Sequence, residues 1–372
     1  MKSRMHSLDF IRVLAMIMVV VVHTRNFFFS WDTAPLVYLL LRAFGTLGVP
    51  LFVLLSGYLM FDRQYSDTEY LEHYMRCNLL PLVISFECWN LLWFLFDQIG
   101  PLRYPGGGFP LDMNRVIKAA LFMGDTGTAL WYLPMTIGLY LGLPIASIAI
   151  QKLEVASKKY AKLIFLALVV FGTAIPSIKL VLQFVGHEGA VHPVLSINIF
   201  GASVWGDSVW MLYLLSGWLI KKGALRKVST IPLMLCGVIL PMAGAMVCDC
   251  LSAMGLGQTS LQTYSFVLYV ITAVCLFELI VRNEACFSRV NEILLDCLAG
   301  LSTTSFFTYM IHLFIFGLMC HLGIPAVCVG CSVPMEVLLY IILIAAIVVV
   351  SHCFAMWLSK IKPVAKWLLL IK

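Results

Sequence analysis

The chain has 372 residues, of which 61% are hydrophobic and only 12% are charged. A soluble core could not enclose that much apolar surface, and the composition also excludes a disordered chain and a small disulfide-rich secreted domain. The net charge of +6 is spread thinly along the chain, so nucleic acid is not expected as a partner. The sequence therefore predicts a polytopic protein whose partner is the lipid bilayer.

A transmembrane helix needs roughly 20 mainly apolar residues. Segments of about that length are separated by charged or turn-forming residues, and we expect an all-α fold with about ten transmembrane helices. The predicted spans cover residues 8–29, 43–61, 77–99, 129–150, 163–185, 205–220, 230–249, 261–281, 301–322 and 334–358. Residues 1–372 are expected to form a single membrane-embedded domain without an appended soluble domain.

The Lys and Arg residues between these spans indicate the orientation of the chain. Most of them fall on one side if the N-terminus lies inside the cell, which places both termini in the cytoplasm. Asp9 and Arg12 interrupt the first apolar run, and no small-residue cleavage site follows His23. The first span is therefore expected to remain in the protein and not to be removed as a signal peptide.

The first span carries three residues that a bilayer rejects unless they face protein or water. Asp9 and Arg12 are three residues apart, and His23 follows Arg12 after eleven residues, close to three helical turns. All three therefore project from roughly one face, with His23 about 16 Å along the axis from Arg12. Neutral imidazole can take a proton from a hydroxyl or accept an acyl group. The alternative is a structural ion pair of Asp9 with Arg12, and a His23 that lies at the outer interface.

Small residues and a proline shape the second span. Gly45, Gly48 and Gly57 permit close approach of backbones, and Pro50 frees a carbonyl from helical pairing. A broken helix beside a cavity, with Ser56 lining it, is one interpretation. Ordinary helix packing is the other.

The third span opens with Arg76 at its cytoplasmic end and contains Glu87 about three turns deeper. The forked guanidinium of an Arg can bind phosphates, although an interfacial Arg that reaches for water is the alternative. A carboxylate at the depth of Glu87 should be neutral or matched by a partner. Both residues are candidates for a binding site.

Polar residues also mark two later spans. Ser302, Ser305, Tyr309 and His312 follow one another at helical spacing, so they share a stripe that serves either a site or interhelical hydrogen bonds. Trp131 and Tyr132 begin the fourth span, where aromatic residues are common at the membrane interface. Weaker candidates are Asp207, Glu278, His321 and His352. No metal site is expected.

Taken together, these residues resemble the acyltransferase-3 family of integral membrane acyltransferases. The stretch from Leu8 to Ala15, with the spacing from Arg12 to His23, is similar to the opening motif of the family. Four further matches follow in order, namely Gly48 to Phe52 with Ser56 to Leu59, Arg76 to Pro81, Trp131 to Leu133, and Ser305 to His312. Family members often carry several Arg residues in the third-helix segment, whereas this chain offers Arg76 alone. The chain resembles stand-alone members that modify polysaccharides such as enterobacterial common antigen.

The resemblance implies a ten-helix enzyme of the bacterial inner membrane. It implies transfer of an acyl group, usually acetyl from acetyl-CoA, to a hydroxyl of a surface glycan or a lipid-linked sugar. It assigns a catalytic role to His23, as general base or transient acyl carrier, and makes Arg12 essential. We add Asp9 to the catalytic group, Arg76 and Arg12 to acyl-CoA binding, and a set of acceptor-binding or cavity-lining residues. That set is Trp131, Tyr132, Ser56, Glu87, Tyr309 and His312.

Two other functions remain open from the residues alone. A secondary transporter or flippase would also have buried charges and kinked helices, although we find no repeated pair of interrupted helices in the two halves. A non-catalytic membrane scaffold would not need Asp9, Arg12 and His23. The sequence does not identify the acceptor, and it leaves open whether the chain forms a homo-oligomer.

Overall fold

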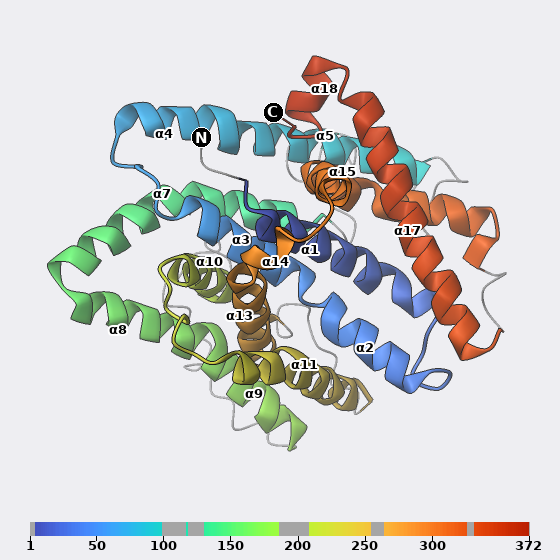
Figure 1. Cartoon of the computed structure of the whole chain (residues 1–372), viewed down its shortest axis with the longest axis horizontal. Helices are drawn as coiled ribbons and strands as arrows, with labels where there is room; N and C mark the ends of the chain where they lie inside the picture. Colours follow the sequence, from blue (N-terminus) through green and yellow to red (C-terminus); the bar gives the residue numbers. More distant parts are fainter. Residues whose placement is uncertain are drawn as a thin grey trace. The chain divides into compact units, whose positions relative to one another are not determined.

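The computed structural model describes residues 4–98, 117, 130–185, 208–253, 264–325 and 331–371, and these ranges contain helices and no strand (Figure 1). The chain divides into two compact units, which we describe separately. The first unit comprises Met1–Ala15, Arg42–Glu72 and Gly138–Val290, and the second comprises Met16–Leu41, His73–Ile137 and Asn291–Lys372.

Each predicted span corresponds to helical structure. The α-helices are α1 (His6–Thr24), α2 (Pro35–Gly45), α3 (Gly48–Met60), α4 (Thr68–Tyr74), α5 (Leu80–Gln98), α7 (Tyr132–Ala156), α8 (Lys158–Val169), α9 (Ile175–Phe184), α10 (Ser208–Lys221), α11 (Thr230–Ala253), α13 (Val267–Arg282), α14 (Glu284–Phe287), α15 (Glu292–His321), α17 (Val333–Leu358) and α18 (Lys362–Trp367). In the described residues, eight helical segments are long and apolar enough to cross a membrane. Helices α10 and α13 are shorter, with 14 and 16 residues. The prediction of an all-α polytopic membrane protein is confirmed.

Two helix boundaries differ from the prediction for identifiable reasons. The second span begins at Pro35, which suits the first position of a helix, and is interrupted between Gly45 and Gly48. Pro50 lies in the first turn of α3, where an N–H would have no helical partner in any case, so the break precedes the proline. The ninth span begins nine residues before the predicted 301, because the Asn291 side chain caps α15 by accepting the N–H of Ile293 at 2.8 Å.

Two spans contain a widened π-helical turn that the hydrophobic pattern did not predict. These turns are η2 (Met75–Leu79), between α4 and α5, and η4 (Val170–Ala174), between α8 and α9. Each ends two residues before a proline, namely Pro81 and Pro176. A proline has no N–H and its ring clashes with the carbonyl four residues earlier. A π turn relieves both conflicts by adding one residue to the turn.

Helices α3 and α10 of the first unit lie side by side (Figure 1). Their backbones are in contact at two glycines. A Cβ atom on Gly57 would overlap the carbonyl oxygen of Leu214, and one on Gly217 would overlap the carbonyl oxygen of Leu54. Small residues at such crossings let backbones approach and form Cα–H···O contacts, which are a main source of attraction between helices in lipid. The contact is reciprocal, since each helix supplies one glycine and one carbonyl.

The same four-residue sequence makes both halves of this contact. Leu-Leu-Ser-Gly occurs at 54–57 in α3 and at 214–217 in α10, followed in each case by an aromatic residue and a leucine. The two helices run in the same direction, because Lys221 at the end of α10 binds Asp62, just beyond the end of α3, at 2.6 Å. The same short sequence thus lies on both sides of one helix crossing.

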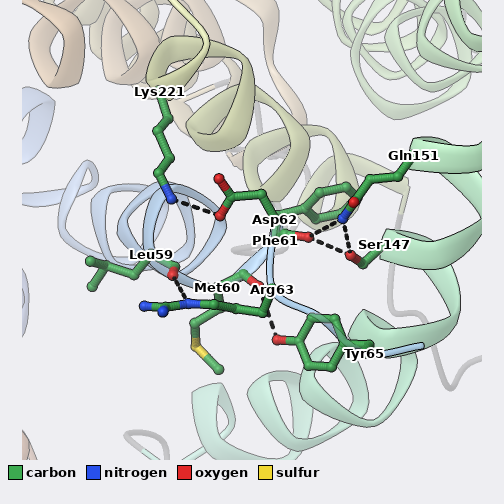
Figure 2. A network of polar contacts seen from close by, with 9 residues as sticks. All are labelled: Leu59, Met60, Phe61, Asp62, Arg63, Tyr65, Ser147, Gln151 and Lys221. Atoms are coloured by element: carbon green, nitrogen blue, oxygen red, sulfur yellow. Dashed lines mark hydrogen bonds and ion pairs between the residues drawn. The ribbon is translucent and has the colours of Figure 1, made fainter. Parts of the chain in front are cut away.

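The last carbonyls of α3 are satisfied by side chains from the first unit (Figure 2). Such carbonyls have no partner within the helix and must find donors elsewhere. The donors and their acceptors are Arg63 Nε to Leu59 O (2.9 Å), Tyr65 OH to Met60 O (2.9 Å), Gln151 Nε2 to Phe61 O (3.2 Å) and Ser147 Oγ to Phe61 O. Burial raises the pKa of the Tyr65 phenol, so its hydroxyl stays protonated and remains a donor.

In the second unit, α15 packs against α17, and α18 packs against α5. Thr304 Oγ1 and His352 Nδ1 form a hydrogen bond of 2.8 Å between α15 and α17. The carbonyl of Leu368 accepts hydrogen bonds from Ser85 Oγ at 3.2 Å and from Trp89 Nε1 at 3.1 Å. Polar side chains in these apolar helices therefore serve as connections between elements.

We predict that Gly57→Ala destabilises the protein by about 2 kcal/mol or more, because the added methyl group overlaps backbone that cannot move aside. Thermal unfolding of purified protein in detergent measures the effect. The matched control is Gly237→Ala in α11, where a Cβ atom would lie 3.9 Å from Leu279 Cδ1 and make ordinary contact. Equal melting temperatures for the two variants would contradict the assigned crossing.

Candidate functional site

The beginning of α1 is held by a carboxylate from α14. The backbone N–H groups of His6 and Ser7 donate to Glu284 Oε1 and Oε2 at 2.9 and 2.8 Å. A negative charge at a helix N-terminus satisfies free N–H groups and interacts favourably with the helix dipole. Glu284 thereby fixes the helix that carries the predicted catalytic residues.

Asp9 is buried near this end of α1 and is bound by Arg4. The guanidinium contacts both carboxylate oxygens, with Nε 2.6 Å from Oδ2 and Nη2 3.0 Å from Oδ1. Sequence analysis placed Arg12 beside Asp9 and did not single out Arg4, which precedes the helix and folds back onto it. A carboxylate whose two oxygens both contact one guanidinium is engaged in that ion pair, which suits a structural role better than proton transfer.

Ser56 forms a polar pair with a tyrosine that was not singled out from the sequence. Ser56 Oγ donates to the Phe52 carbonyl at 3.0 Å and lies 2.9 Å from the hydroxyl of Tyr140. Since Ser56 has one hydroxyl proton, Tyr140 is the donor in the second bond. The first unit thus contains two predicted site residues, Arg12 and Ser56, and pairs Ser56 with Tyr140.

His23 lies in the last turn of α1, beside His312 of α15, and both belong to the second unit. The ring centroids are 5.4 Å apart and the ring planes are tilted by 43°. His312 is fully buried, and its Nδ1 lies 2.6 Å from the carbonyl oxygen of Tyr309. A carbonyl only accepts hydrogen bonds, so the proton of neutral His312 is assigned to Nδ1. Sequence analysis selected both histidines but did not predict that they meet.

The end of α1 around His23 is held against α17. Thr24 Oγ1 donates to the Val20 carbonyl at 2.8 Å and lies 3.0 Å from the hydroxyl of Tyr340. The Tyr340 hydroxyl is also 3.2 Å from the Val21 carbonyl. The buried Arg25 lies over the ring of Tyr38, 5.3 Å from its centroid. Thr24, Arg25 and Tyr340 were not singled out from the sequence because single polar residues near a span end are common.

Aromatic residues connect His312 with the start of α7. The Tyr309 ring is 6.0 Å from the His312 ring and 5.5 Å from the Tyr132 ring, and Trp131 lies 6.5 Å from Tyr132. The second unit therefore brings together His23 and four residues that the sequence predicted to line a cavity or bind an acceptor.

Other candidates lie elsewhere. Arg76 is exposed in η2, and Glu87 is half-buried on α5. Ser305 Oγ donates within α15 to the Ser302 carbonyl at 2.8 Å, so its hydroxyl serves its own helix.

The weaker candidates have structural contacts or lie apart. Glu278 pairs with Arg282 one turn later at 2.8 Å. His321 is exposed at the end of α15, and His352 makes the bond to Thr304 described above. Asp207 lies outside the described residues. Within those residues, no group of three or more His, Cys, Asp or Glu side chains could hold a metal ion.

The comparison with protein families decides the assignment. A family model described as an acyltransferase domain matches residues 5–357, from just before α1 almost to the end of α17. The chain belongs to the acyltransferase-3 family. It is therefore a multi-pass membrane acyltransferase. Searches of curated proteins and of solved structures found no significant match.

For the cap on α1 of this acyltransferase, we predict that Glu284→Ala lowers the free energy of unfolding by about 1 kcal/mol, because two helix N–H groups lose their acceptor. Thermal unfolding in detergent measures the loss. Glu284→Gln keeps one acceptor oxygen without the charge and should be less destabilising. If alanine and glutamine variants both unfold like the parent protein, Glu284 does not anchor the helix.

Proposed function

We propose that the protein transfers an acyl group, in the simplest case acetyl, from cytoplasmic acyl-CoA to a hydroxyl of a surface glycan or lipid-linked sugar. The observation that carries the proposal is the position of His23 in a membrane acyltransferase, beside a buried imidazole and an aromatic cluster. An imidazole in such a place can act as a general base. The proposed location is the cytoplasmic membrane of a bacterium, with both termini in the cytoplasm.

In the proposed reaction, neutral His23 removes the proton of the acceptor hydroxyl, and the oxygen attacks the thioester carbonyl carbon. The carbon–sulfur bond then breaks, and the CoA thiolate takes the proton from His23. Transfer through an acyl group carried on His23 is the alternative within the same reaction. Both routes start from neutral imidazole.

For the donor, the proposal uses Arg12 and Arg76. Guanidinium groups bind phosphates through paired hydrogen bonds, and CoA carries several phosphates. Arg12 lies on α1, the helix whose N-terminus is bound by Glu284. Arg76 is exposed at the end of its span, where a nucleotide outside the bilayer could reach it.

For the acceptor, the proposal uses the aromatic residues that lead to His312. Trp131 and Tyr132 offer ring faces against which a sugar can pack, and both are partly exposed. The aromatic chain through Tyr309 ends beside the two histidines. A sugar held by these rings would present a hydroxyl near His23.

We predict that His23→Ala lowers acyl transfer by at least about 100-fold, the contribution expected of a general base. The measurement is release of free CoA from acetyl-CoA by purified protein in detergent, supplied with a lipid-linked saccharide extract. His321→Ala, which replaces an exposed histidine of α15, is the matched control and should be as active as the parent. Full activity of His23→Ala would refute the proposal, and a transporter or flippase would release no CoA in either protein.

We predict that Arg12→Ala raises the KM for acetyl-CoA by about tenfold or more, because a charge-assisted contact to the donor is lost. Steady-state kinetics with varied acetyl-CoA measure this effect, and thermal unfolding verifies that the variant is folded. An unchanged KM would remove Arg12 from the donor site.

A further inference from the structure

His312 has one nitrogen with no partner. Its Nδ1 donates to the Tyr309 carbonyl, so its lone pair is on Nε2. That Nε2 atom is buried and makes no hydrogen bond. A buried acceptor without a donor is unfavourable, and such an exception calls for a specific explanation.

The geometry identifies a ring N–H of His23 as the donor that could reach His312 Nε2. Two imidazoles joined by one N–H···N hydrogen bond have centroids about 5 Å apart, given a nitrogen–nitrogen distance of about 3 Å. The observed separation of 5.4 Å is close to this value. At this separation, the two rings are within reach of one N–H···N hydrogen bond.

Resting on the proposed role of His23, we propose that His312 is a positioning residue that accepts a hydrogen bond from His23 when His23 becomes charged during the reaction. Neutral His23 has one N–H, whereas the imidazolium formed by taking the hydroxyl proton has two. One of these N–H groups then donates to His312 Nε2. When the thiolate takes a proton from His23, the imidazolium is neutral again, and His312 has gained and lost no proton.

This arrangement favours the transition state over the resting state. The hydrogen bond between the rings is absent in the structure and forms as charge develops on His23, so it contributes where it accelerates the reaction. The bond to Tyr309 holds the accepting tautomer in advance. Preorganisation of this kind requires no rearrangement of His312 during catalysis.

An imidazole suits this position better than a carboxylate does. A carboxylate must be charged to accept the bond in the same way, and burial of that charge in a membrane is costly. Asp9, the acid on the same helix as His23, has both of its oxygens bound by Arg4. His312 accepts as a neutral group.

Two substitutions separate the proposed role from simple helix packing. In His312→Gln, the side-chain oxygen can occupy the place of Nε2 and accept, whereas in His312→Asn the amide nitrogen occupies the place of Nδ1 and preserves the bond to Tyr309. We expect kcat to fall by about 100-fold in His312→Asn and His312→Ala, with an unchanged KM for acetyl-CoA, and to remain within about tenfold of the parent in His312→Gln. The matched control is His352→Ala, which replaces another intramembrane histidine and should leave kcat unchanged.

The outcomes distinguish this inference from the function on which it rests. If His312→Asn is active and His312→Gln is not, activity requires the bond to Tyr309 and not an acceptor at the position of Nε2, and the inference is overturned. It is also overturned if kcat follows the melting temperature across the variants. In a His23→Ala background, His312→Ala should cause no further loss, since both residues act in one step. An active His23→Ala protein refutes the proposed function itself, whereas an inactive His23→Ala with a fully active His312→Ala refutes only the present inference.

Discussion

A bilayer core contains no water, so polar groups of this chain must find their partners within the protein. Several polar side chains of the described helices meet this constraint by binding a neighbouring helix. Ser56 binds Tyr140, Thr304 binds His352, and Trp93 Nε1 donates to the Met310 carbonyl at 3.1 Å. His312 Nε2 is one of several buried atoms in the described residues that form no hydrogen bond, and it lies beside the histidine of the first helix. That position supports a chemical interpretation of the second unit.

Hydropathy predicted the helical architecture because a helix that crosses lipid needs a long apolar segment, and such segments can be recognised in the sequence. Boundaries were harder to predict because they depend on single contacts. The start of α15 depends on a cap by Asn291, and the break before α3 depends on where Pro50 falls within a turn. The backbone contact at Gly57 and Gly217 could not be predicted, because the two glycines are 160 residues apart and the sequence does not show that their helices are neighbours.

The candidate site was predicted one helix at a time. Arg12 and His23 stood out as polar residues within an apolar span, and their spacing indicated that they share one face of the helix. Periodicity carries no information about contacts between distant segments, so neither the meeting of His23 with His312 nor the pairing of Ser56 with Tyr140 could be deduced. Glu284 was missed for the same reason, since it caps a helix that begins 278 residues earlier.

The widened turn η2 changes what the third span presents to its surroundings. Arg76 and Glu87 are eleven positions apart, a separation that would align them in a regular α-helix. The turn that accommodates Pro81 inserts an extra residue between them, and one residue corresponds to about 100° of rotation. Arg76 itself lies within this turn, so the alignment that a regular α-helix would give the two side chains does not hold in the third span.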